Sequence, residues 1–560
     1  MTRLTEIKII LLGLTALAAV ACSPQKPENI GYSDSTVFHG GTILSLTPDN
    51  SEAMMIHKRE IFALGFLDHF QKIAPEATYV DLGGKTVMPG FIDSHVHVRE
   101  LGMDAIKADL VGVSSVHEMV QRLRDYYPDP KAGQWLIGQG WDEGQFASRG
   151  YPDRGVLDEA FPQNPIKLES LHGFAGFYNG AALDIAGVTS ATVNPNGGTI
   201  LRREDGEATG VMLALGQGLV NQHAPDPDQA QIEKAILAGL NIMAEKGVTS
   251  IHEAGMTPKD VQAFQALAKR GELPIRVYGM LNGNDQELMT EWFSRGMLDD
   301  PDDYLDIRAI KVFYDGSLGS RTALMKAPYT DSPETQVAAE RISQDDMLAL
   351  GRAAADHEFQ MAVHAIGDLG NDVTLGQYED ILESPPGYDH RWRIEHAQVV
   401  LPDFFKRQAA LGVIASMQPS HAVGDSKWAE DRVGPVRIRN AYAWRTILSH
   451  GGHLIFNSDL PGEPWTPMET LHFAVNRQSL KGTPEGGWYT DQALNVIEAI
   501  RAMTIGGAHS AFQDDKLGTL EADKWADFVI LSDNPLSVPK DQIKNIKVEQ
   551  VWVAGQRYDP

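Results

Sequence analysis

The chain has 560 residues, of which 43% are hydrophobic and 22% are charged, so it has room for one large domain and a smaller one. These fractions are typical of soluble folded proteins and argue against long disorder. The formal net charge of −27 repels phosphate backbones and anionic lipid, which argues against nucleic acid as a partner.

Residues 1–22 have the pattern of an export signal. A basic start precedes an apolar run at 9–20, which is too short for a comfortable membrane span. Small residues then lead to Cys22, the only cysteine of the chain, in a setting that resembles a bacterial lipobox. We expect an exported protein that a lipid on Cys22 anchors to the cell envelope, on the periplasmic side or the cell surface, with 23–36 as a polar tether. The alternative is an ordinary secretory signal with an incidental cysteine.

In the rest of the chain, the predicted secondary structure changes character twice. Residues 37–90 are β-rich, with glycines between the short strands. From 91 to 510, apolar strand-like runs alternate with helical stretches, which predicts an α/β fold with a (β/α)8 TIM barrel and insertions. Short predicted strands return at 511–560. We therefore expect both ends of the chain to form one small composite β-sandwich beside the barrel.

The first candidate metal-binding residues along the chain are His95 and His97. They follow the apolar stretch 87–92 and its Pro-Gly turn. Because side chains alternate along a strand, two histidines spaced by two residues point the same way, an arrangement that suits one divalent ion. This spacing is common by chance and is weak evidence alone.

Three further candidates stand at the ends of later predicted strands. His364 and His396 each close an apolar strand, and Asp459 follows another. In barrel enzymes these ends meet at the active face, so the three residues are expected beside the first pair. Taken singly, each histidine suits a structural hydrogen bond, and the aspartate suits a turn or cap. As a series, they predict metal ligands, with Asp459 also able to act as a general base.

Lys311 lies inside the apolar strand 310–313. Lysine is rarely buried without a partner. It is either exposed on a strand edge, or it faces the barrel mouth and is modified there.

Three segments of the sequence resemble a known family. The stretch 87–97, which contains the two histidines, is similar to the opening metal motif of the amidohydrolase superfamily. The stretch 311–323, from Lys311 through Asp-Gly-Ser-Leu-Gly-Ser-Arg-Thr-Ala, resembles the amidohydrolase-3 branch around YtcJ-like hydrolases and N-substituted formamide deformylase. The stretch 518–529 resembles the closing β segment of the superfamily.

The resemblance implies a metal centre for one or two divalent ions, with zinc as the default metal. In this pattern His95 and His97 bind one ion, and His364 and His396 bind the second. Lys311, carboxylated by CO2, bridges the ions. Asp459 is the last member of the set. It binds metal and serves as the catalytic base for a metal-activated water.

The resemblance also suggests residues that position a small-molecule substrate: Tyr314, Arg321 and His421, although Arg321 equally suits a structural ion pair. One departure from the family pattern concerns the pocket. Where relatives carry Asp-Gly-His, this chain has His172 and, two positions on, Phe174. A phenylalanine there predicts a more apolar wall, so the substrate of a relative is not transferred.

The main hypothesis is a metal-dependent hydrolase acting on a non-peptide carbon–nitrogen bond of an amide or formamide. The alternatives are another reaction of the superfamily (a deaminase, a cyclic amidase, or a lactone or ester hydrolase) and a non-catalytic binding lipoprotein.

Overall fold

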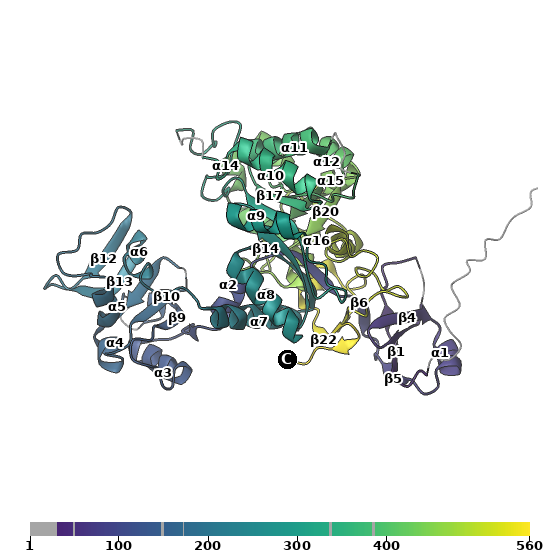
Figure 1. Cartoon of the computed structure of the whole chain (residues 1–560), viewed down its shortest axis with the longest axis horizontal. Helices are drawn as coiled ribbons and strands as arrows, with labels where there is room; N and C mark the ends of the chain where they lie inside the picture. The colour runs from purple at the N-terminus through teal and green to yellow at the C-terminus, as the bar shows by residue number, and fades with distance from the viewer. Residues whose placement is uncertain (1–30, 49–50, 147–149, 172, 335–338, 383–386) are drawn as a thin grey trace, which may run out of the picture.

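The computed structural model describes residues 31–48, 51–146, 150–171, 173–334, 339–382 and 387–560. A central barrel lies between an insertion on one side and a small β region on the other (Figure 1). Two predicted functional residues, Cys22 and His172, lie outside the described residues. Within the described part, no helix has the length and apolar character needed to cross a membrane.

An eight-stranded parallel sheet forms the barrel. Its strands are β7 (Phe91–Val96), β14 (Val248–Met256), β15 (Arg276–Asn282), β16 (Leu305–Phe313), β17 (Gln360–Ala365), β18 (Arg393–His396), β19 (Ile414–Met417) and β20 (His453–Phe456). Each pairs with the next in chain order, from β7 to β20. The strands are almost wholly buried, because helices cover the outside of the sheet.

The two edge strands of this sheet meet just past β20. The main-chain N–H of Asp459 donates to the carbonyl oxygen of His95 at 2.9 Å. The N–H of Ser458 donates to the carboxylate of Asp93, also at 2.9 Å. These bonds join the loop after β20 to β7 and close the barrel where its strands end. The predicted (β/α)8 barrel is confirmed.

Helices alternate with the barrel strands. The principal ones are α7 (Gln229–Glu245), α8 (Pro258–Arg270), α9 (Gln286–Arg295), α10 (Gln344–Asp356), α11 (Asp368–Leu382), α12 (Phe404–Leu411), α15 (Trp444–Ser449), α16 (Pro467–Asn476), α17 (Val496–Ala502) and α18 (Ile505–Ser510). A further helix, α2 (Val98–Ala105), begins directly after His97 and packs on α7. Glycine at 102 allows this contact, since a Cβ there would lie 1.7 Å from the carbonyl oxygen of Ala235.

Both ends of the chain contribute to a five-stranded sheet. Its neighbour order is β2 (Thr42–Ile43), β6 (Thr86–Pro89), β21 (Phe528–Leu531), β22 (Val548–Val553) and β23 (Gln556–Arg557). A four-stranded sheet beside it uses the N-terminal segment alone: β4 (Glu60–Gly65), β3 (Ala53–His57), β1 (Ser35–His39) and β5 (Thr78–Asp81). The rings of Phe38 and Phe528 pack edge to face at 5.1 Å in the core that they share, so the composite β region is confirmed.

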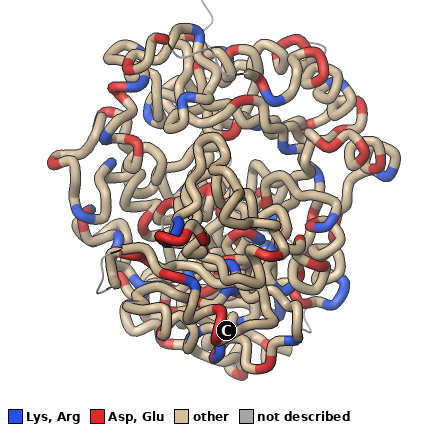
Figure 2. Tube along the Cα trace, turned by 90° about the vertical axis from the view of Figure 1, so that its left-hand side faces the viewer, with Lys and Arg blue, Asp and Glu red and all other residues tan. Residues whose placement is uncertain are grey.

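The insertion between α2 and α7 forms a sheet of its own. Six strands pair in the order β12 (Gly198–Arg202), β13 (Ala208–Ala214), β11 (Ala175–Tyr178), β10 (Ile166–Ser170), β9 (Leu136–Trp141) and β8 (Ala108–Asp109). It has a separate hydrophobic core around Trp141 and Phe177. The sequence predicts insertions but not this sheet. Acidic and basic residues are interspersed along the trace on the side that carries it (Figure 2).

Candidate metal centre

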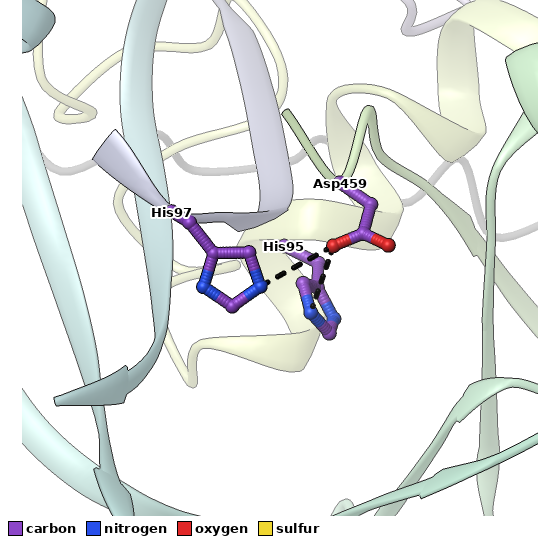
Figure 3. Close-up of side chains that lie close together, drawn as sticks. All are labelled: His95, His97 and Asp459. Carbon is purple, nitrogen blue, oxygen red and sulfur yellow. Dashed lines mark ion pairs between the residues drawn. The ribbon is translucent and has the colours of Figure 1, made fainter. Parts of the chain in front are cut away.

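His95 and His97 lie at the carboxyl end of β7. His95 is fully buried within the strand, and His97 is the residue before α2. The centroids of their rings are 5.5 Å apart. Both rings face the carboxylate of Asp459, which comes from the loop after β20 (Figure 3). The structure therefore brings together the first pair and the last member of the predicted series.

Asp459 stands between two pairs of histidines. Its Oδ1 is 3.4 Å from Nε2 of His95 and 3.4 Å from Nε2 of His97. Its Oδ2 is 3.9 Å from Nδ1 of His396 and 3.8 Å from Nε2 of His421. On each side, one histidine pair and the shared aspartate place three ligand atoms within 4.8 Å of one another.

The second histidine pair comes from β18 and from α13 (Pro419–Asp425). His396 ends β18, and its Nδ1 is 3.0 Å from the side-chain oxygen of Gln418. The ring of His421 stacks on that of His396, with centroids 6.0 Å apart. The family resemblance suggests a substrate role for His421, whereas the structure gives it the position of a third ligand beside His396 and Asp459.

Lys311 is fully buried in β16, beside the first cluster. Its Nζ is 3.2 Å from Nε2 of His95 and lies 4.3 Å from the ring centroid of Phe313. The strand-edge alternative is therefore wrong, because this lysine faces the barrel interior. Its carboxylation stays a prediction.

His364 lies near the end of β17, and its ring centroid is 4.3 Å from that of His396. Its Nε2 is 3.0 Å from the carbonyl oxygen of Gly316 and 3.4 Å from the carboxylate of Asp315. The structure thus places His364 next to the second cluster but includes it in neither group of three ligand atoms.

Burial and neighbouring side chains together set the protonation states at this end of the barrel. Burial lowers the pKa of His95 to about 4 and the pKa of His396 to about 3, so both imidazoles are neutral, the form that binds metal. Burial acts to raise the pKa of Asp459, but the neighbouring histidines outweigh this effect and hold the pKa well below its usual range. Asp459 is therefore ionised. Burial also lowers the pKa of Lys311 to about 8, so a neutral amine is accessible near neutral pH.

Two charged residues that sequence analysis did not single out lie directly behind His95. Arg393 and Glu395 belong to β18, and both are fully buried. Oε2 of Glu395 is 2.5 Å from Nδ1 of His95, and Nε of Arg393 donates to Oε1 of Glu395 at 2.7 Å. Burial acts to raise the pKa of Glu395, but Arg393 and His95 bring the pKa well below its usual range. The sequence did contain a signal for this pair: two charged residues spaced by two positions within an apolar strand.

Strained backbone accompanies these side chains. Asp459, His396 and Ala397 have φ angles of 54°, 74° and 42°. Non-glycine residues rarely adopt such angles, and they cluster at functional sites, where the surrounding structure holds them in place.

The remaining predicted substrate residues lie in different parts of the fold. Tyr314 follows β16, is fully buried, and donates its hydroxyl to Glu340 at 3.1 Å. Arg321 forms an ion pair with Asp331 at 2.8 Å, in keeping with its structural alternative. Phe174 precedes β11 in the insertion, and 71% of its surface is exposed. Roles for these residues in substrate binding stay predictions.

The two clusters fit a divalent ion by the chemistry of their donors. Imidazole nitrogen and carboxylate oxygen are ligands that zinc accepts. Three protein ligands would leave an ion a coordination position for water or substrate, as in catalytic rather than structural zinc sites. The buried contact between His95 and Glu395 is of the kind that orients a metal-binding histidine.

Comparisons with known proteins identify the family of this chain. Residues 78–558 match the family model described as "Amidohydrolase family". The chain is 30% identical to YtcJ of Bacillus subtilis over 530 residues, which are 93% of this chain and 98% of that protein. It is 27% identical to the N-substituted formamide deformylase of Arthrobacter pascens, over 86% and 90% of the two chains. The crystal structure of an uncharacterized metal-dependent hydrolase from Pyrococcus furiosus matches with a TM-score of 0.74 and 28% identity, over 90% of this chain and 100% of that one.

The barrel and its histidine clusters define the class of metal-dependent hydrolases. Within that class, the chain belongs to the amidohydrolase family. The resemblance to the amidohydrolase-3 group that the sequence motifs indicate is confirmed.

Proposed function

We propose that this protein hydrolyses a non-peptide carbon–nitrogen bond of a small molecule, of the amide or formamide type. The observation that carries the proposal is the Asp459 carboxylate, which lies within 3.9 Å of four imidazole nitrogens where the barrel strands end. Among the relatives, the one named N-substituted formamide deformylase supports the type of bond.

The metal that we propose is zinc, held as one or two ions. His95 and His97 with Asp459 would hold one ion, and His396 with Asp459 a second. At the second ion, His421 has the spacing of a ligand, and His364 remains the ligand predicted from the family pattern. A bound divalent ion lowers the pKa of a water molecule toward neutrality and polarises a carbonyl group.

Asp459 is the residue that we assign to proton transfer. Its ionised carboxylate accepts a proton from the attacking water as the oxygen bonds to the substrate carbonyl carbon. It then gives that proton to the nitrogen as the carbon–nitrogen bond breaks, so the products are a carboxylic acid and an amine. A hydrogen bond from His97 helps to keep the carboxylate ionised and in place before the reaction.

Two alternatives use the same fold. A deaminase, cyclic amidase, or lactone or ester hydrolase of the superfamily would use the same ligands and differ only in what the pocket admits. A non-catalytic binding lipoprotein would have no need of a buried base between two histidine pairs.

The cellular setting is proposed from the sequence. We propose export, followed by lipid attachment at Cys22 as the sole membrane contact. The proposed partner is a small-molecule substrate, and the net charge of −27 argues against binding to nucleic acid or to anionic lipid surfaces. Labelling with a radioactive fatty acid, in wild type and in Cys22→Ser, tests the anchor: label retained by Cys22→Ser would refute it.

A hydrolysis screen tests the proposed reaction. N-formyl amines, N-acyl amines, lactams, lactones, esters and aminopurines are incubated with the zinc-loaded protein, and the products are measured by mass spectrometry. We expect turnover of N-formyl or N-acyl amines to exceed that of the other groups. Turnover confined to esters or lactones, or deamination alone, would replace the proposed reaction with the corresponding alternative.

A further inference from the structure

The carboxylate of Glu395 contacts three side chains that can donate hydrogen bonds to it. Arg393 contacts it with two nitrogens, Nε to Oε1 at 2.7 Å and Nη2 to Oε2 at 3.0 Å. Ser416 donates its hydroxyl to Oε2 at 2.6 Å. Nδ1 of His95 is 2.5 Å from the same oxygen. Because a two-point contact with a guanidinium stabilises the anion, Glu395 is a carboxylate and accepts every one of these bonds.

This geometry fixes the proton of His95. A carboxylate has no hydrogen to donate, so Nδ1 of His95 carries the proton in the bond with Glu395. In the neutral ring, Nε2 is then left with a free lone pair. Nε2 is the nitrogen that points to Nζ of Lys311 at 3.2 Å and to Oδ1 of Asp459 at 3.4 Å. The lone pair on Nε2 of His95 is thus directed toward Asp459, the carboxylate that His95 shares with His97.

Arg393 is itself held firmly in the barrel interior. Its Nη2 donates to the carbonyl oxygen of Ser94 at 2.6 Å and to the hydroxyl of Ser416 at 3.1 Å, and its Nη1 is 3.0 Å from Nδ1 of His252. Through Arg393, strand β18 is therefore bonded to residues of β7, β14 and β19. Rigid partners of this kind keep a ligand orientation constant, which lowers the cost of binding an ion.

We propose that Glu395 is the positioning residue of the metal centre: it holds the proton of His95 on Nδ1, orients the ring, and so sets the affinity for the ion bound by His95 and His97. This inference rests on the proposed metal site and adds to it a residue that does not touch the ion. Arg393 and Ser416 keep Glu395 in the orientation that this role requires.

Affinity for Zn²⁺ itself tests the inference, without any substrate. The dissociation constant is measured by competition with a chromophoric chelator, for wild type, Glu395→Gln and Glu395→Asp. We expect Glu395→Gln to weaken zinc binding by about 10–100-fold, the loss typical when the partner of a metal-binding histidine is removed. Glu395→Asp keeps the charge but shortens the side chain by one methylene, so its loss should be intermediate, and it serves as the test variant if the glutamine variant does not fold.

Asp527→Asn is the matched control. Asp527 forms the same kind of buried two-point contact, with Nε of Arg276 at 2.7 Å and Nη2 at 3.0 Å, at the start of β15 and far along the strands from His95. It should destabilise the chain and leave the zinc affinity unchanged. Zinc binding by a folded Glu395 variant within about twofold of wild type, or an equal loss in Asp527→Asn, would overturn the positioning role. A wild-type protein that binds no zinc would instead refute the proposed metal site.

Discussion

Replacing Asp459 with asparagine is expected to lower kcat by about 10²–10⁴-fold, the usual contribution of a positioned general acid–base. Asparagine has nearly the same shape but cannot accept and return a proton. The main-chain bond from residue 459 to the carbonyl oxygen of His95 does not depend on the side chain, so the loop should keep its place. Steady-state kinetics on the best substrate of the screen would measure the loss.

Asp306→Asn is the control for this variant. Asp306 is also buried, but it lies at the start of β16, where it accepts from Gln513 at 2.8 Å, at the opposite end of the barrel from Asp459. Its asparagine variant should retain the wild-type rate. If Asp459→Asn turned over substrate as fast as Asp306→Asn, the base assignment would be wrong.

The family pattern predicts that a carboxylated Lys311 bridges the metal ions. Substituting Lys311 with methionine is then expected to reduce activity by about 10²-fold or more, since a bridging ligand should matter at least as much as an outer partner of a ligand. An unmodified ammonium beside two metal ions would be repelled by them. Reaction of the neutral amine with CO2 forms a carbon–nitrogen bond, releases one proton, and gives an anionic carbamate. The methionine side chain fills similar space but cannot react.

Protein stripped of metal and CO2 should regain activity at a rate that depends on pH. This dependence distinguishes a carboxylated Lys311 from a lysine that only packs in the interior. Because burial lowers the pKa of Lys311 to about 8, its neutral fraction in the metal-free chain rises as the pH increases through 8. At a fixed concentration of dissolved CO2, activation of protein stripped of metal and CO2 should therefore accelerate from pH 6.5 to 8.5. Lys516→Met, which alters a lysine paired with Asp303, should behave as wild type. Activation that is independent of CO2 would contradict the bridging carbamate.

The barrel was predictable because its strands are short apolar runs separated by helical periodicity. The same pattern located His95, His97, His396 and Asp459, since strand ends converge in a parallel barrel. The insertion was not predictable as a sheet, because strands such as β8 and β11 are short, and β11 pairs with β13 rather than with β12, the next strand in the chain. Pairing over such distances leaves little trace in local sequence.

Side-chain direction was the second limit. Sequence spacing places His364 and His396 at neighbouring strand ends but cannot show that Nε2 of His364 faces the carbonyl oxygen of Gly316. It also cannot show that His421, which comes from a helix after β19, shares the carboxylate of Asp459. Glu395 was missed for another reason: the charges at 393 and 395 stand out in the strand, but only the structure shows that Glu395 contacts Arg393 and His95.

Metal analysis of the purified protein, expressed with zinc supplied, tests the central claim most directly. The account predicts about one to two tightly bound divalent ions per chain in wild type, and a clear loss in the double variant His95→Ala/His97→Ala. Wild type with well under about one ion per chain, or a double variant that binds as much metal as wild type, would contradict a metal centre at these residues.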